Sequence, residues 1–267
     1  MSSTAKLIAL QDRIRRIERP GAPRHGLLPF QVAAIDRVLP GSGLALGAVH
    51  EILGDGADEE DGAAVAGFAA GIAGRIAKEN NPGLVLWVLK RGDLYGPGLA
   101  EHGLDPARIV RVTAPRDDDI QWVFEEGLRT AGVAAVVGEV GRLPMVAGRR
   151  LQLAAERSGV TALVLRRWRN SAEAASERER PSAAVTRWRV AAIPSLSASG
   201  VDAEPGIGTP RWRVELLRCR GAETTNGAWD VEVADASGLV SVPAGLGDRP
   251  AAPRRFATAS GRWRSAG

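Results

Sequence analysis

The chain has 267 residues, of which 45% are hydrophobic, so it is long enough to bury a sizeable core in one large domain. Its 35 basic and 31 acidic residues give a formal net charge of +4, a mild excess that permits nucleic acid as a partner without requiring it. Cys219 is the only cysteine, which excludes an intrachain disulfide and a cysteine-based zinc site. Since no segment has the apolar length of a signal peptide or a membrane span, we expect a cytoplasmic protein.

The first predicted element is an amphipathic helix over residues 5–18, because apolar side chains recur there at three- and four-residue steps and Pro20 would end it. Its apolar positions are Leu7, Leu10, Ile14 and Ile17. We expect this helix to pack outside the main core.

From about residue 43, strand patterns alternate with helical patterns. The predicted order is strand 46–53, helix 62–78, strand 84–89, helix 94–102, strand 109–112, helix 117–130, strand 133–139, helix 145–158 and strand 160–165. Such alternation is typical of a parallel sheet with helices on both faces. The runs LVLWVL and VAAVV are apolar on both faces, as central strands are. On helix 117–130 we expect Trp122 to pack against the core.

After residue 166 the pattern changes to AVTRWRVAAI, PRWRVELLRC and AWDVEV, which predicts antiparallel strands added to one edge of the sheet. The expected fold class is therefore α/β, with a mainly parallel sheet, an antiparallel edge, an N-terminal helix and a C-terminal tail. We divide the chain into the helix at 1–22, a core domain at 23–240 and a tail at 241–267, whose Arg, Pro and Gly content indicates mobility.

The stretch from Glu51 to Ala70 has the strand, glycine turn and helix that surround a phosphate-binding loop. A working loop has the form GxxxxGK[ST], because backbone amides hold the phosphates, lysine neutralises them and the hydroxyl binds magnesium. No Lys or Arg occurs from residue 38 to residue 74, and the turn is acidic, so it would repel a triphosphate. A site that uses an unusual arrangement of cations is the alternative.

Aligning Gly54 with the first glycine of the motif puts acids at the positions that need Gly, Lys and Ser or Thr, and ending the motif at Gly62 instead gives only alanines. We therefore predict a degenerate nucleotide site. Its loop residues are Gly54, Gly56, Glu59, Glu60 and Asp61.

Five segments, in this order, resemble the core of RecA-type recombinases: LALGAVHEILGDG, LVLWVLKRGDLYGPGLAEHGLDPARIVRV, GLRTAGVAAVVGEVGRL, RRLQLAAERSGVTALVL and PRWRVELLRCRG. More closely, the chain resembles the ImuA family of translesion-synthesis-associated proteins, which are degenerate relatives of RecA. The resemblance runs from about Leu28 to Pro250 and is most specific in FQVAAIDRVLPGSGLALGAVHEI.

The RecA resemblance implies two catalytic acids, and this chain retains little of either. The strand after the loop helix should end in a carboxylate that activates water, but Lys90 and Arg91 stand there, with Asp93 nearby as a substitute. The acid for magnesium falls at Gly138, and the next residue, Glu139, is the one ATPase-like acid that survives. Because lysine, metal and positioning make up most of phosphoryl-transfer catalysis, the resemblance implies a pseudo-ATPase with no catalytic residue, metal or cofactor.

The resemblance further implies a noncatalytic accessory factor of damage-induced (SOS) error-prone translesion DNA synthesis. The implied partners are a Y-family polymerase-like protein of the ImuB type, an error-prone replicative-type polymerase alpha subunit reached indirectly, RecA, and DNA bound weakly without sequence preference. Two alternatives remain open: a divergent ATP-binding recombinase or DNA-dependent ATPase, and an SOS cell-division inhibitor.

The tripeptide Arg-Trp-Arg occurs four times. In the copies at 187–189 and 211–213, strand alternation turns the tryptophan inward and the arginines to water, which favours core packing. The copy at 167–169 lies in the segment 166–184, where RecA-like proteins have a DNA-binding loop, and arginines interleaved with an aromatic can bind phosphates and stack on bases. The DNA-binding candidates are Arg166, Arg167, Trp168 and Arg169.

The fourth copy lies in the tail, where apolar side chains between arginines could order on a partner. The partner-binding candidates are Phe256, Arg262, Trp263 and Arg264. The structural alternative is that Phe256 or Trp263 covers a sheet edge or the emptied nucleotide cleft.

Overall fold

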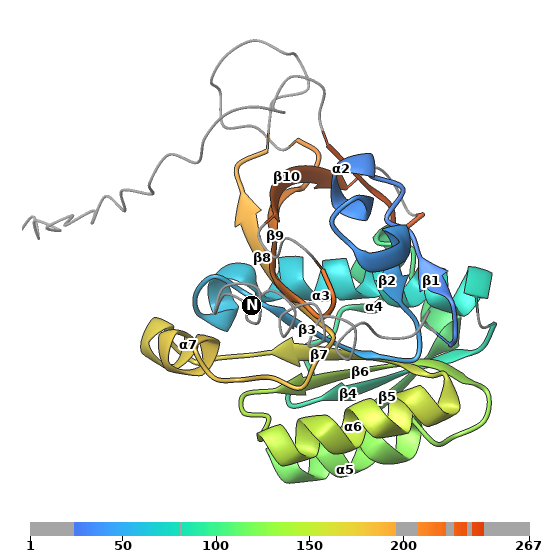
Figure 1. Cartoon of the computed structure of the whole chain (residues 1–267). Coiled ribbons are helices and arrows are strands. Elements are labelled where there is room, and N and C mark those ends of the chain that lie inside the picture. Colours follow the sequence, from blue (N-terminus) through green and yellow to red (C-terminus); the bar gives the residue numbers. More distant parts are fainter. Residues whose placement is uncertain (1–23, 81, 196–207, 223–226, 234–236, 243–267) are drawn as a thin grey trace, which may run out of the picture.

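The computed structural model describes residues 24–80, 82–195, 208–222, 227–233 and 237–242, which are coloured in Figure 1. The helix expected at 5–18 and the tail from residue 243 lie outside the described residues. The same holds for the partner-binding candidates Phe256, Arg262, Trp263 and Arg264.

A nine-stranded sheet in the order β11-β10-β9-β8-β3-β7-β6-β4-β5 forms the centre of the molecule. Its parallel strands are β3 (Val49–Leu53), β4 (Leu84–Leu89), β5 (Ile109–Thr113), β6 (Val133–Val140), β7 (Thr161–Arg166) and β8 (Thr186–Ile193). The strands β9 (Arg211–Cys219), β10 (Gly227–Val233) and β11 (Val240–Ser241) complete one edge in antiparallel pairing.

This arrangement confirms the predicted α/β class and is consistent with a RecA-like core. One detail of the prediction is wrong: β8 pairs parallel with β3, so the change to antiparallel pairing comes one strand later, between β8 and β9. Strand alternation alone does not encode the direction of pairing.

Helices cover both faces of the sheet, with α3 and α4 on one face and α5 and α6 on the other (Figure 1). Their bounds are α3 Asp58–Arg75, α4 Gly96–Glu101, α5 Asp117–Gly127 and α6 Met145–Ser158. In β4, Trp87 belongs to the core under α3 and Val88 to the core under α5 and α6, which is why the run LVLWVL is apolar at every position.

Short elements fill the connections. The hairpin β1 (Leu27–Leu28) with β2 (Leu44–Ala45) encloses α2 (Ala33–Asp36) and a 3-10 turn (Pro40–Ser42), another 3-10 turn (Pro106–Arg108) precedes β5, a π-helical turn (Ile76–Asn80) follows α3, and α7 (Ser171–Arg178) follows β7. Among the described residues, no helix is both long and apolar enough to cross a bilayer.

The strand predicted at 46–53 begins only at Val49, because Gly47 before it takes a positive φ of 63°. The loop helix begins at Asp58 rather than at residue 62. The prediction that Trp122 packs is wrong, since its side chain is 66% exposed on α5.

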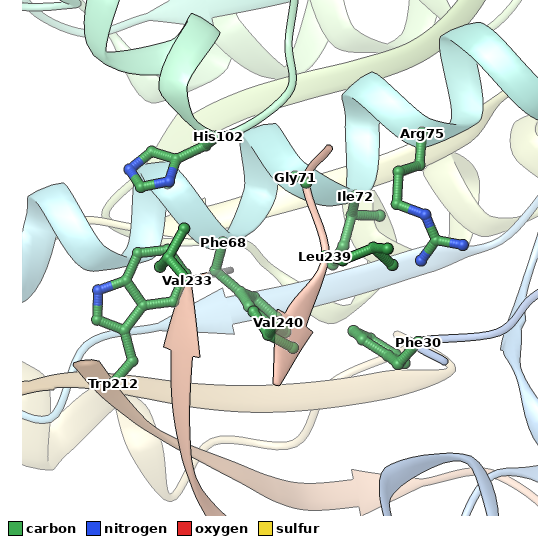
Figure 2. A pocket seen from close by; sticks show the side chains of 12 residues that line it. Phe30, Phe68, Gly71, Ile72, Arg75, His102, Trp212, Val233, Leu239 and Val240 are labelled. Atoms are coloured by element: carbon green, nitrogen blue, oxygen red, sulfur yellow. The ribbon is translucent and has the colours of Figure 1, made fainter. Parts of the chain in front are cut away.

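In the two Arg-Trp-Arg copies in strands, the tryptophans are buried as predicted: Trp188 and Trp212 are 0% and 5% exposed. The prediction that the arginines face water is wrong for Arg211, which is 8% exposed, and for Arg187, whose side chain is 11% exposed and pairs with Glu51. Both tryptophans contact Phe68 of α3. Figure 2 shows the cavity beside Phe68 and Trp212, whose volume of about 20 Å³ leaves room for no more than a water molecule. This face of the sheet is therefore a packed core.

Candidate functional site

The predicted nucleotide site lies where the parallel strands end. β3 ends at Leu53, the turn follows, and α3 begins at Asp58, as the strand-turn-helix pattern predicted. Open parallel sheets bind ligands at the carboxyl ends of their strands, so this edge is where a nucleotide would sit.

The carboxylate of Asp61 occupies the amides of this turn. Its Oδ2 accepts hydrogen bonds from the backbone N–H of Asp55 at 3.0 Å and of Gly56 at 3.3 Å. Its Oδ1 accepts from the backbone N–H of Ala192 in β8 at 2.9 Å. In a working phosphate loop such amides bind phosphate oxygens. In this chain the carboxylate of Asp61 accepts hydrogen bonds from two of these amides, those of Asp55 and Gly56.

Asp61 is 5% exposed, and the turn is built around it. A Cβ at Gly54 would come within 3.0 Å of the Asp61 Cβ, so glycine allows the close approach. The other two predicted loop acids, Glu59 and Glu60, are exposed on the first turn of α3. Among the predicted loop acids, Asp61 is therefore the one whose buried carboxylate contacts the amides of the turn.

Arg167, in the segment after β7, binds three carboxylates at the same edge. Its guanidinium contacts Asp58 through two nitrogens, Nε at 2.6 Å and Nη2 at 2.5 Å. Nη1 donates to Glu139 of β6 at 2.8 Å, and Nη2 pairs with Asp93 at 2.9 Å. The side chain thus joins the loop helix to the ends of β4 and β6, from which the catalytic acids of a RecA-type ATPase would come.

Burial and pairing shift the acids in opposite directions. Burial raises the pKa of Glu139, although the charge of Arg167 and three hydrogen bonds oppose the rise. The hydrogen bond from Arg167 lowers the pKa of Asp93. Burial lowers the pKa of Arg167, but its hydrogen bonds with Asp58 and Asp93 outweigh this and raise the pKa above its ordinary value. The cluster is most stable with Arg167 charged.

Glu139 has no free face toward a metal. Besides Arg167 it accepts from the indole N–H of Trp87 at 3.3 Å and from the backbone N–H of Lys90 at 3.4 Å, and it is 2% exposed. Within the described ranges, no three or more His, Cys, Asp or Glu side chains group in a way that could hold a metal ion.

The DNA-binding candidates are mostly covered in the structure. Arg166 is 4% exposed and pairs with Glu177 of α7 at 2.9 Å. Trp168 is 2% exposed, and its indole N–H donates to the carbonyl of Gly141 at 3.1 Å, so the ring cannot stack on a base. Of the four candidates, only Arg169 has a fully exposed side chain, at 79%.

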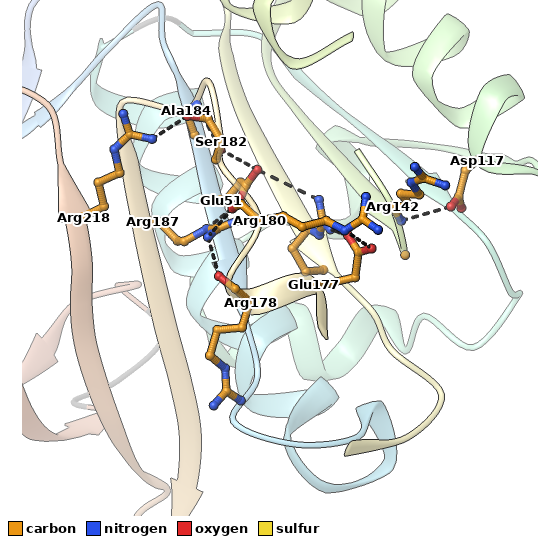
Figure 3. Close-up of polar contacts among 12 residues, drawn as sticks. Glu51, Asp117, Arg142, Glu177, Arg178, Arg180, Ser182, Ala184, Arg187 and Arg218 are labelled. Atoms are coloured by element: carbon orange, nitrogen blue, oxygen red, sulfur yellow. Dashed lines mark hydrogen bonds and ion pairs between the residues drawn. The ribbon is translucent and has the colours of Figure 1, made fainter. Parts of the chain in front are cut away.

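Polar contacts fix the segment after β7 to the sheet (Figure 3). Glu51 of β3 accepts from Ser182 at 2.7 Å and from Nε of Arg187 at 2.8 Å. Arg187 also donates to the carbonyl of Arg178, at the end of α7. The segment 166–184 is therefore held by β3 and β8 through α7 and the residues that follow it.

The sequence contains a capping pattern for α7, which the interpretation based on alternating strands and helices did not use. Asn170 caps the helix by accepting from the backbone N–H of Glu173 at 2.8 Å, and Glu173 accepts from the backbone N–H of Arg169. An Asn followed three residues later by Glu is a known helix-start pattern.

An open cleft of about 370 Å³ adjoins Arg167. It lies between the ends of β4, β6 and β7, and cations predominate along it. Lys90 pairs with Asp117 at 2.7 Å. The other basic side chains that line the cleft are Arg91, Arg142, Arg167 and Arg169.

Comparison with known proteins gives the family. No family model matches the chain. The curated proteins named ImuA from Caulobacter vibrioides strains NA1000 and CB 15 are each 39% identical to it over 212 residues, which cover 79% of this chain and 84% of the relative. The aligned length exceeds two thirds of both proteins, so the similarity extends over most of the chain and is not confined to one motif. The chain belongs to the ImuA family.

Proposed function

We propose that this protein is a noncatalytic accessory factor of damage-induced, error-prone translesion DNA synthesis. Its membership in the ImuA family supports the pathway. It acts by binding a Y-family polymerase-like protein and, through that protein, an error-prone replicative-type polymerase. RecA and DNA are further proposed partners.

One observation supports the proposal that the protein is noncatalytic: Asp61 accepts hydrogen bonds from the backbone amides of the loop. A phosphate could reach these amides only by displacing a buried carboxylate that accepts three backbone hydrogen bonds. The arginines that reach the turn itself, Arg178 and Arg189, already pair with Asp55. Arg167, which contacts Asp58 at the start of α3, is already shared among three carboxylates. Removing one partner from such a buried set is costly, so neither group is free to bind a nucleotide.

Nucleotide binding tests this proposal. A fluorescent ATP analogue with magnesium should show no saturable binding to the purified protein, and ATP hydrolysis should stay at background with and without single-stranded DNA. An active RecA-type recombinase serves as the positive control. DNA-stimulated turnover comparable to that control would establish the rival function, a divergent DNA-dependent ATPase.

Two surfaces of the described part support binding to other macromolecules. Three large apolar side chains are exposed on the outer helices: Trp122 on α5 and Val146 and Leu153 on α6, at 66%, 72% and 58%. Aromatic side chains of this kind often dominate protein interfaces. The basic cleft with Arg91, Arg142 and Arg169 suits the phosphates of DNA, and binding there would weaken steeply with salt.

A further inference from the structure

A second cavity lies at the opposite end of the sheet, where the parallel strands begin. It is a groove of about 640 Å³ between the β2 region, the end of α6, the start of β8 and the end of β9. Its apolar wall consists of Leu27, Leu39, Pro40, Leu46, Val185 and Cys219. The groove is separate from the candidate nucleotide site, and nothing in the proposed function uses it.

The buried polar side chains that line the groove, Gln152 and Thr186, already have hydrogen-bond partners. The side-chain oxygen of Gln152 accepts from the backbone N–H of Val49 at 2.9 Å, and its nitrogen donates to Glu156 at 2.8 Å. The hydroxyl of Thr186 bonds to His50 and to the indole of Trp188, both at 2.7 Å. With these partners engaged, the wall offers mainly apolar surface, which suits the apolar face of a helix better than a charged ligand.

The described chain begins at the rim of this groove. Arg24 and His25 both line it. The Nε2 of His25 lies 2.8 Å from the carbonyl oxygen of Glu156, in the last turn of α6. The ring also fits against Gly47, where a Cβ would come within 2.4 Å of it. The point at which residues 1–23 join the core is therefore fixed beside the apolar wall.

The sequence immediately before that point supplies a matching surface. Leu7, Leu10, Ile14 and Ile17 recur at helical spacing, and such a stripe needs an apolar partner. Seven chain steps separate Ile17 from residue 24, so the end of the stripe lies within about 25 Å of the rim. A tether this short gives an effective concentration in the millimolar range. We propose that residues 5–18 dock as an amphipathic helix in the groove of their own chain.

Cys219 is a built-in reporter for this docking, because it lines the groove and is the only cysteine in the chain. The test compares its rate of modification by a soluble thiol reagent in the full-length protein and in a Leu10→Asp, Ile14→Asp variant. Cys219 is 5% exposed in the wall of the groove, so removing the apolar contact should raise the rate about tenfold or more by letting the reagent reach that wall. The matched control, Ala5→Asp with Ala9→Asp, adds two acids to the opposite side of the stripe and should leave the rate unchanged.

A synthetic peptide of residues 1–20, added to the Leu10→Asp, Ile14→Asp variant, should restore the protection. Equal modification rates in the variant and the wild type would overturn the proposal. Protection of the wild type that disappears on dilution would overturn it as well, since the occupant would then be a second copy of the chain. Where the double aspartate variant loses its tryptophan fluorescence signature, Leu10→Ala with Ile14→Ala gives the same comparison.

Discussion

Asp61 joins the turn, the first turn of α3 and β8 through three backbone hydrogen bonds from Asp55, Gly56 and Ala192. Substituting Asp61 with Ala leaves these amides without their acceptor in a nearly closed space, and each such loss costs about 1–3 kcal/mol. We expect Asp61→Ala to lower the free energy of unfolding by about 2–4 kcal/mol, because solvent can satisfy part of the demand. Urea unfolding at pH 7 measures this.

Asp61→Asn is the control for that prediction, since its one remaining side-chain oxygen can still accept. It should destabilise less than Asp61→Ala. If both variants were as stable as the wild type, the carboxylate of Asp61 would not stabilise the turn.

Arg167 is the other residue whose removal should be costly. Replacing it with Met leaves Asp58, Asp93 and the buried Glu139 without their shared cation. Breaking a buried ion pair from one side typically costs about 3–5 kcal/mol, and we expect a loss of this order for Arg167→Met. In the variant the pKa of Glu139 should rise further, because the nearest opposing charge is gone.

The control is Arg169→Met, at a side chain that is 79% exposed, which should change stability by less than about 0.5 kcal/mol. Adding Glu139→Gln to Arg167→Met should recover part of the loss. Strictly additive effects in that double-mutant cycle would show that the two side chains do not interact.

The sequence alone could show only part of this site. The absence of a lysine and a hydroxyl from the loop was visible from the motif, and the degenerate nucleotide site stays a prediction. Asp61 was predicted as a site residue, but its contact with the turn depends on a backbone geometry that residue types do not specify. Arg167 and Asp58 are 109 positions apart, and no local spacing links them. For that reason Arg167 was assigned to DNA instead of to the acids.

At the scale of single elements, β3 carries a buried histidine that should make stability depend on pH. The ring of His50 lies between Thr186 of β8 at 2.7 Å and the carbonyl of Ala45 in β2 at 2.8 Å. Because a carbonyl oxygen can only accept, Nε2 carries the proton and Nδ1 accepts from the hydroxyl. Burial lowers the pKa of His50 to about 4, against its ordinary 6.5, although the bond to Ala45 opposes the shift.

The sign of the effect follows from which state binds the proton. Between pH 6.5 and about 4 the unfolded chain takes up a proton at His50 that the folded chain does not. The stabilisation is therefore complete above pH 6.5 and is lost as the pH falls toward 4. From pH 7 to pH 5 this single group should remove about 2 kcal/mol.

His50→Gln tests this prediction by removing the titrating group. Urea unfolding at pH 7 and pH 5 should show a smaller loss on acidification in the variant than in the wild type, by about 2 kcal/mol. The variant will also be less stable at both pH values, so the quantity to compare is the difference between them. An identical pH dependence in the two proteins would mean that His50 is not the group that titrates.

Elements were predictable where one period dominated. Helix 145–158 and strand 84–89 match α6 and β4 at both ends, because each has a clear helical or apolar pattern. The helix α7 was missed, since its eight residues are mostly polar and their capping pattern is short. The position of α7 depends on contacts with residues outside the helix, namely the ion pair of Glu177 with Arg166 and the hydrogen bond from Arg187 to the carbonyl of Arg178, and not on the periodicity of the segment itself.

At the scale of the whole molecule, the sequence order of strands and helices predicted the layered α/β arrangement, since parallel strands need crossover helices. The position of β8 could not be predicted in the same way. Its pattern, TRWRVAAI, suits either direction of pairing, and it joins β3 in parallel only because the segment with α7 brings the chain back to the other end of the sheet.

The remaining prediction separates partner binding from folding. The tail carries Phe256 and Trp263 among arginines, a composition that favours interaction over a stable independent element. In the described part, the sheet already extends to β11 at Val240–Ser241. Deleting residues 251–267 should therefore weaken association with the Y-family polymerase-like partner while the Tm stays within about 2 °C, since surface changes outside the core cost little stability.

Exposed side chains on the helices provide the comparison for this deletion. Trp122→Ala tests whether the α5 and α6 face contributes to the same association, and Tyr95→Ala, at a side chain that is 71% exposed before α4, is the matched aromatic control. An affinity measurement on the three variants assigns the interface: loss in the deletion alone places it on the tail, and loss in Trp122→Ala as well extends it to the outer helices. Unchanged binding in the deletion, or a large fall in its Tm, contradicts the assignment to the tail, because the first outcome removes its interaction role and the second makes it part of the fold.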